Sequence, residues 1–160
     1  MEEHPQYCAQ RSLNALVELG KLTLPIDIGI IARLYSVSII VSAELTQGAY
    51  GMAFNYNNIR YAAIAPIINT PLQLPLLRYT IAHEIAHHIM GHLLNPWDNS
   101  NEVQADEYAR SLLIPAAVVN LNPNITALEL SHLCCVPYNV ARHRLIELCA
   151  DNIEEYITCS

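Results

Sequence analysis

The sequence predicts an α+β fold, in which a small antiparallel three-stranded sheet packs on a core of helices and a helix-turn-helix-like tail follows. Three short strand-like segments lie in the first half of the chain, and segments with helical spacing of apolar residues follow them. Hydrophobic residues make up 52% of the 160 residues, and the mean hydropathy is +0.22. This content is enough to bury a core and excludes a disordered chain.

Two helices are predicted before the strands, at residues 12–19 and 24–34. Apolar residues recur at helical spacing in both, and Gly20 follows the first as a stop signal. Residues 37–41 are β-branched and bounded by polar residues, which is typical of a short strand.

Two further strands are predicted at residues 48–56 and 59–65. Residues 55–58, Asn-Tyr-Asn-Asn, supply the turn between them, because Asn tolerates left-handed backbone conformations. We therefore expect the small sheet to be largely antiparallel.

A long helix is predicted at residues 76–90, with Gly91 as its stop, and a second at residues 101–114, ended by Pro115. Two short tail helices are predicted after it, at residues 124–133 and 137–150. We expect one domain over residues 1–120 and a small helical tail over residues 121–160, which packs on that domain and is not independent of it.

The long helix carries the pattern His83-Glu84-x-x-His87 within an apolar run. At about 100° per residue, the two histidines lie on one helix face about one turn apart. They can reach a single metal ion there, and Glu84 lies beside them. The alternative is a chance pattern that leaves only a polar patch on a core helix.

The next helix offers a third ligand. Glu102 and Asp106 are four residues apart on one face, and the small side chains of Ala105 and Ala109 allow this helix to approach the first closely. Glu102 can then reach the metal, and Asp106 can accept the free ring N–H of a ligating histidine. The alternative is that both are ordinary solvated acids. His88 and His92 form a competing pair without a matching acid, and we interpret them as rim or solvated histidines outside the site.

Residues 78–87, 102–109 and 112–115 resemble the ImmA/IrrE family of zinc metallopeptidases, and the similarity extends over about residues 24–148. Tyr79 and Tyr108 stand where that family commonly has Phe, Ala86 where it has Gly, and Ile114 where it has Met. None of these differences touches a proposed ligand.

The resemblance implies a zincin-like helical core and a cytoplasmic, gluzincin-like peptidase. Carried over position by position, it makes His83, His87 and Glu102 the zinc ligands and Glu84 the catalytic residue, and it places Asp106 behind a ligating histidine. It also implies a protein substrate, a helix-turn-helix transcriptional repressor of a phage, mobile element or stress regulon. The alternative is a non-catalytic zinc-containing module that controls a repressor by binding. Two histidines and a carboxylate suit Zn²⁺ and, to a degree, Mn²⁺.

Two details of the expected hydrolysis stay open. The oxyanion needs a donor besides the metal, and the candidates are Tyr56, Tyr61, Tyr108 and His143. The substrate is expected to add as an extended strand to an open edge of the sheet.

The remaining sequence features concern partners and location. No apolar run approaches the length of about 20 residues that spans a bilayer, and the acidic N-terminus does not resemble a signal peptide, so we expect a cytoplasmic protein without membrane contact. The five cysteines are expected to be reduced and mostly buried. The net charge is −7, and residues 121–160 carry two arginines against five acidic residues. Direct nucleic-acid binding, the function of a rival DNA-binding tail, is therefore not expected.

Overall fold

The computed structural model describes residues 4–45, 49–94 and 98–158, with side chains described as far as residue 149. The helices of this part are α1 (Pro5–Glu18), α2 (Ile28–Leu34), α3 (Leu74–Ile89), α4 (Asn99–Leu113), α5 (Ala116–Asn120), α6 (Ala127–Cys134) and α7 (Tyr138–Thr158). The strands are β1 (Val37–Val41), β2 (Gly51–Tyr56) and β3 (Ile59–Ile64), and the short 3-10 helices are η1 (Pro66–Ile68), η2 (Pro71–Gln73) and η3 (His92–Leu94).

The sheet has the strand order β1-β3-β2. As predicted, β2 and β3 form an antiparallel hairpin, and its two turn residues Asn57 and Asn58 have φ angles of 49° and 62°. Both values lie in the left-handed region that this turn requires. β1, however, pairs with β3 in parallel. The predicted α+β class is confirmed, but the sheet is mixed and not purely antiparallel as expected.

The mixed pairing follows from which strand is central. Each strand reverses the direction of the one before it, so β1 and β3 run the same way and become parallel neighbours when β3 lies between the other two. Ala62, Ala63 and Ile64 of β3 are 0%, 1% and 0% exposed. A continuous apolar run of this kind is typical of a strand covered on both faces. The run Tyr-Ala-Ala-Ile-Ala in the sequence is the feature that indicates a central position for β3.

The predicted boundaries differ from the observed ones mainly at element ends. α1 begins at Pro5 because proline is favourable in the first turn of a helix. The strand predicted from residue 48 begins at Gly51, and residue 48 itself lies outside the described residues. The sequence indicates only the end of a helix at Pro115, whereas in the structure α5 begins directly after it.

Side chains at the helix ends account for several boundaries. Asp27 accepts hydrogen bonds from the backbone N–H groups of Gly29 and Ile30 and so caps α2. Asp98 caps α4 in the same way through Ser100. Gly91, with φ of +73°, follows the end of α3 and turns the chain sharply.

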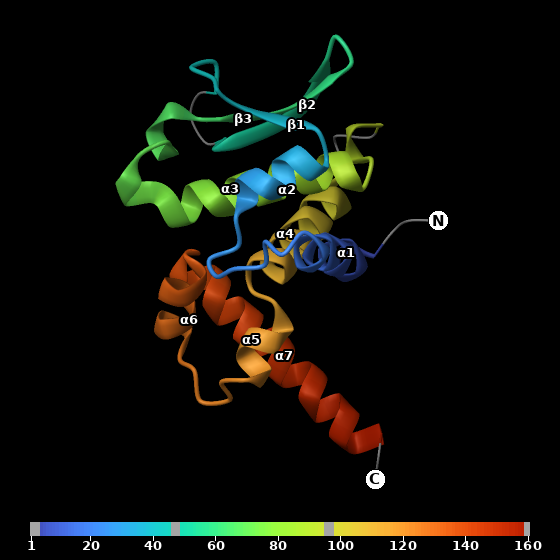
Figure 1. Ribbon diagram of the computed structural model, residues 1–160, viewed down its shortest axis with the longest axis vertical. Helices are drawn as coiled ribbons and strands as arrows, with labels where there is room; N and C mark the ends of the chain where they lie inside the picture. The colour runs from blue at the N-terminus through green and yellow to red at the C-terminus, as the bar shows by residue number, and fades with distance from the viewer. Residues whose placement is uncertain (1–3, 46–48, 95–97, 159–160) are drawn as a thin grey trace.

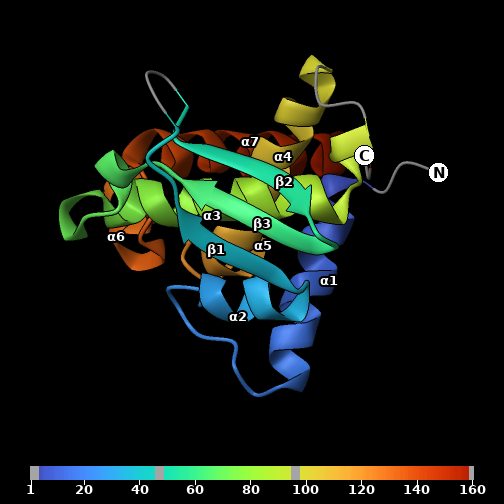
Figure 2. The same cartoon turned by 90° about the horizontal axis from the view of Figure 1, so that it is seen from above.

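The helix α3 is the centre of the molecule. It packs against β2 and β3 on one side and against α4 on the other, as Figures 1 and 2 show. Its side chains at Ile81, Ala82, Ile85 and Ala86 are buried in the core, and Ala105 and Ala109 of α4 are completely buried. The small residues of α4 thus allow the close helix–helix approach that the sequence predicted.

The tail helices α6 and α7 are tied to the preceding helices by polar contacts. The guanidinium of Arg144, 5% exposed, donates to the carbonyl of Ile114, and Arg110 of α4 pairs with Glu147 of α7 at 2.9 Å. Arg78 of α3 donates to the carbonyl of Cys135 at the end of α6. The domain boundary at residue 120 stays a prediction.

Two further expectations concern membranes and thiols. No helix in the described ranges combines the length and the hydropathy that a bilayer crossing requires. The described cysteines are thiols, of which Cys8 and Cys134 are buried, Cys135 is partly buried and Cys149 is exposed. The fifth, Cys159, lies outside the described residues.

Candidate metal centre

Two helices bring the predicted site residues together. α3 supplies His83, Glu84 and His87, and α4 supplies Glu102 and Asp106. The ligand atoms of His83, His87 and Glu102 all lie within 4.8 Å of one another. The candidate ligand set of the sequence therefore converges on one point between the helices.

The spacing of the three ligand atoms suits a small metal ion. The Nε2 atoms of His83 and His87 are 3.1 Å apart, and the Glu102 carboxylate lies 3.2 Å from the first and 3.5 Å from the second. Tetrahedral zinc with bonds of 2.0–2.1 Å holds its ligands about 3.3 Å apart. The donors therefore fit zinc without rearrangement. The Glu102 side chain is 59% exposed, so the fourth side of the site opens to solvent.

Asp106 holds the imidazole of His83. The Nδ1 atom of His83 donates to Oδ1 of Asp106 at 2.9 Å, and the hydroxyl of Tyr79 donates to the same oxygen at 2.8 Å. Burial alone would raise the pKa of Asp106, but these two hydrogen bonds outweigh it and lower the pKa. Asp106 thus remains an ionised acceptor, and Nε2 of His83 is left to face the metal position.

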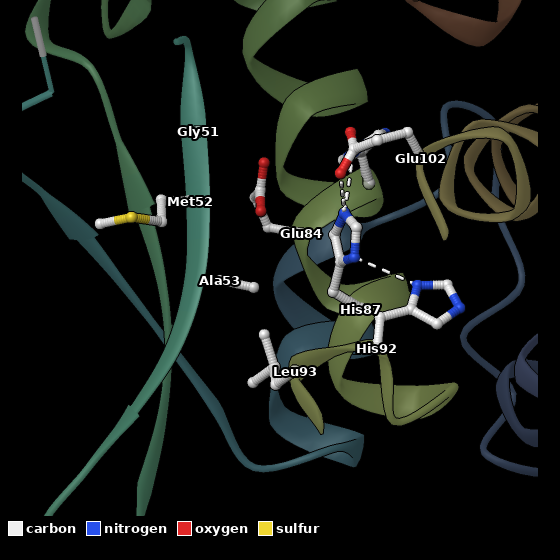
Figure 3. A pocket seen from close by; sticks show the side chains of 9 residues that line it. Gly51, Met52, Ala53, Glu84, His87, His92, Leu93 and Glu102 are labelled. Atoms are coloured by element: carbon white, nitrogen blue, oxygen red, sulfur yellow. Dashed lines mark hydrogen bonds and ion pairs between the residues drawn. The ribbon is translucent and has the colours of Figure 1, made fainter. Parts of the chain in front are cut away.

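His87 has its own neighbours behind the site. Its Nδ1 atom lies 3.1 Å from Nδ1 of His92, and Nε2 of His92 lies 3.1 Å from Oε1 of Gln104. Figure 3 shows the ring of His87 between Glu102 on one side and His92 on the other. Burial, together with the neighbouring histidines, lowers the pKa of His87 to about 3. The imidazole is therefore neutral, as a metal ligand must be.

The interpretation of His88 and His92 as rim or solvated histidines is wrong. They are 7% and 6% exposed. The Nε2–H group of His88 donates to the backbone carbonyl of Tyr61 in the sheet at 2.8 Å, so His88 connects α3 to β3. His92 contacts a proposed ligand directly. His88 lies within α3 and His92 just beyond its end, and the spacing of residues in the sequence indicates neither of these contacts.

Glu84 lies in a narrow space between α3 and β2, as Figure 3 shows. It is 6% exposed, and the backbone N–H of Ala53 donates to its carboxylate. Burial raises the pKa of Glu84 to about 7, although the nearby His83 opposes the rise. A carboxylate with this pKa can take up and release a proton near neutral pH.

Gly51 makes this position of Glu84 possible. A Cβ atom at Gly51 would stand 2.5 Å from Oε1 of Glu84 and 2.6 Å from Cγ2 of Thr80. Only glycine allows β2 to pass this close to α3. This contact could not be predicted from the sequence, because it joins residues that are far apart in the chain.

Two cavities meet at the site and share Gly51, His83, Glu84 and Glu102. One has a volume of about 180 Å³ and extends toward Ala53, His92 and Leu93. The other has a volume of about 370 Å³ and extends toward Tyr50, Leu76 and Tyr79. Together they form a cleft along β2, with the metal position near its middle.

The four candidate oxyanion donors line neither cavity. Tyr108 is completely buried and its hydroxyl lies 3.0 Å from the hydroxyl of Ser12, Tyr61 stacks on Phe54 in the sheet, and His143 pairs with Glu147. The tyrosines that line the cleft are instead Tyr50 and Tyr79. Residue type alone could not distinguish these positions.

The model of the Peptidase_M78 family, described as the IrrE N-terminal-like domain, matches residues 67–146, which is half of the chain. The match includes all five residues of the candidate site. No curated protein and no solved structure matches the chain.

Proposed function

Because the chain belongs to the Peptidase_M78 family of IrrE N-terminal-like domains, we propose that it is a zinc-dependent endopeptidase. The observation that carries the proposal is the convergence of His83, His87 and Glu102 beside a buried carboxylate, Glu84, whose pKa is raised to about 7. The fit of the donor atoms to tetrahedral zinc supports the choice of metal.

Each residue of the site has a separate role in the proposed hydrolysis. His83, His87 and Glu102 hold the metal, which when bound supplies a Lewis acid for activating water and polarising the peptide carbonyl. Glu84 takes a proton from the attacking water and delivers it to the nitrogen of the leaving amine. Its raised pKa makes both the uptake and the release of that proton accessible near pH 7.

The substrate in this proposal lies along the cleft beside β2. β2 is an edge strand, since its only sheet partner in the described chain is β3, and its residues Gly51 and Ala53 line the cleft. An extended peptide can pair with this edge and pass over the metal position. Its side chains then enter the two cavities on either side.

The partner that we propose is a helix-turn-helix transcriptional repressor of a phage, mobile element or stress programme, working in the cytoplasm. The family resemblance motivates this partner. The net charge of −7 favours a protein partner over nucleic acid, since nucleic-acid affinity rests on basic residues.

Incubation with the repressor encoded beside this gene tests the proposal. With added zinc, mass spectrometry should show two repressor fragments, and a chelator should abolish them. Glu84→Gln should bind zinc as the wild type does but give no fragments, whereas the matched control Glu107→Gln on α4 should cleave normally. Undiminished cleavage by Glu84→Gln would refute the role of Glu84. Loss of repressor activity without fragments would favour the non-catalytic regulatory module.

A further inference from the structure

A histidine that binds a metal through Nε2 must carry its proton on Nδ1, and this Nδ1–H needs an acceptor. For His83 the acceptor is the carboxylate of Asp106. For His87, no carboxylate of the described residues contacts Nδ1. The atom that faces it is Nδ1 of His92, at 3.1 Å.

We propose that His92 and Gln104 form a hydrogen-bonded relay that fixes the tautomer of His87. In this relay Oε1 of Gln104 accepts the Nε2–H of His92, so Nδ1 of the neutral His92 carries a lone pair. That lone pair accepts the Nδ1–H of His87. Nε2 of His87 is then free of a proton and faces Nε2 of His83 and the Glu102 carboxylate, where the metal fits.

The direction of the relay decides whether the site can bind metal. If Gln104 presented its NH₂ group, His92 would carry its proton on Nδ1 and donate it to His87. The proton of His87 would then sit on Nε2, at the metal position. An acceptor at position 104 is therefore a requirement of the metal centre, although Gln104 does not touch the metal ligands' binding atoms.

The two partners of His87 in the relay come from two separate elements of the fold. Gly91, with φ of +73°, turns the chain after α3, and His92 at the start of η3 folds back onto His87. Gln104 comes from α4, two residues after Glu102. His92 thus joins α3 and α4 behind the site, as Asp106 joins them at His83. It is a positioning residue for the metal, and it has no direct part in bond cleavage.

Zinc affinity of the purified full chain, measured by competition with a chromophoric chelator, tests the relay. His92→Phe and Gln104→Leu should each bind zinc about 10–100-fold more weakly, the usual loss for a partner behind a ligating histidine. Gln104→Glu should keep or increase the affinity, because a carboxylate can only accept. The matched control is His88→Phe, which removes an equally buried histidine of α3 and should leave zinc affinity unchanged when folded.

A tautomer measurement separates the relay from a merely structural effect. Ring ¹⁵N chemical shifts of the zinc-free protein should show His87 as the Nδ1–H form and His92 as the Nε2–H form, and Gln104→Leu should convert His87 to a mixture. Circular dichroism confirms that each variant is folded. The relay is overturned if His87 is the Nε2–H form in the wild type, or if Gln104→Glu weakens zinc as much as Gln104→Leu.

These readouts do not depend on proteolysis. The inference rests on the metal centre of the proposed function, but zinc affinity and ring tautomers are measured without a substrate. A chain that shows the expected affinities and cleaves no repressor would refute the peptidase and leave the relay intact. A chain that cleaves the repressor with unaltered zinc affinity in His92→Phe would refute the relay alone.

Discussion

The close approach of β2 to α3 predicts that Gly51→Ala damages catalysis and spares metal binding. The added Cβ would stand 2.5 Å from Oε1 of Glu84, whereas ordinary contacts begin at 3.4 Å. The Glu84 carboxylate must therefore move by about 1 Å, since β2 is held by β3 on its other side. A misplacement of this size at a catalytic group costs about 100-fold in rate, or about 2.7 kcal/mol of transition-state stabilisation.

The assay compares kcat/KM for a peptide spanning the cleaved bond with zinc affinity, in the same preparations. Gly51→Ala should lose about 100-fold in kcat/KM, while zinc affinity stays near that of the wild type because the three atoms nearest the new methyl group belong to Glu84 and Thr80 and not to the proposed metal ligands. Overpacking should also lower the free energy of unfolding by about 1–3 kcal/mol. The matched control Gly29→Ala, on α2 and away from the cleft, should leave kcat/KM unchanged.

Two results would refute this reasoning. Wild-type kcat/KM in a folded Gly51→Ala protein would show that β2 does not confine Glu84. An equal loss of zinc affinity and of kcat/KM would show that the methyl group disturbs the whole site and not the carboxylate alone. The melting temperature of each variant shows whether it is folded under the assay conditions, so that a loss of activity through unfolding can be recognised.

Three further predictions concern the ligand carboxylate, the buried acid and the tail. Glu102→Ala should weaken zinc binding by more than about 100-fold, the largest usual loss when a residue that hydrogen-bonds to a metal ligand is removed, because Glu102 is itself a proposed ligand. A decrease in zinc affinity of less than about tenfold in a calorimetric titration would contradict this prediction. Glu84 has a folded pKa raised by burial to about 7, so the folded state holds a proton that the unfolded chain releases above about pH 4.5. Below that pH its contribution to stability is fully present, and it is lost as the pH rises to about 7. In the presence of chelator, the free energy of unfolding of the wild type should therefore fall by about 3 kcal/mol relative to that of Glu84→Gln between these pH values. Urea unfolding at several pH values measures both, and the same pH dependence in the two proteins would disprove the prediction. Glu147→Ala should lower the free energy of unfolding by about 3 kcal/mol, because it leaves the partly buried guanidinium of Arg110 and the buried guanidinium of Arg144 without their carboxylate. Thermal unfolding should stay a single transition; a separate early transition would mean that the tail folds independently.

The parts of the site that could be predicted from the sequence are those that helical geometry fixes. His83 and His87 are one turn apart on α3, so their shared face follows from the period of the helix alone. Glu102 and Asp106 have the same spacing on α4, and the small residues beside them indicated that the two helices approach closely. The structure brings these four residues together as the sequence predicted.

Long-range contacts account for what the sequence could not predict. The order of the strands depends on which strand the helices cover, and the hairpin signal at Asn57 and Asn58 determines only the pairing of β2 with β3. The contact of Gly51 with Glu84 joins a strand to a helix across 33 positions of the chain. Neither has a local signature in residue type or spacing.

The two histidines of the candidate site show this difference most clearly. The partner of His83 is Asp106, which lies on a regular helix and carries a charge, so both its position and its role could be inferred from spacing. The partner of His87 is His92, which follows the left-handed turn at Gly91. Beyond that turn the helical period no longer gives the direction of a side chain, so the contact of His92 with His87 could not be predicted from the sequence. A glycine that ends a helix therefore marks the point beyond which spacing arguments fail, and here the residue just past that point is the one that contacts His87.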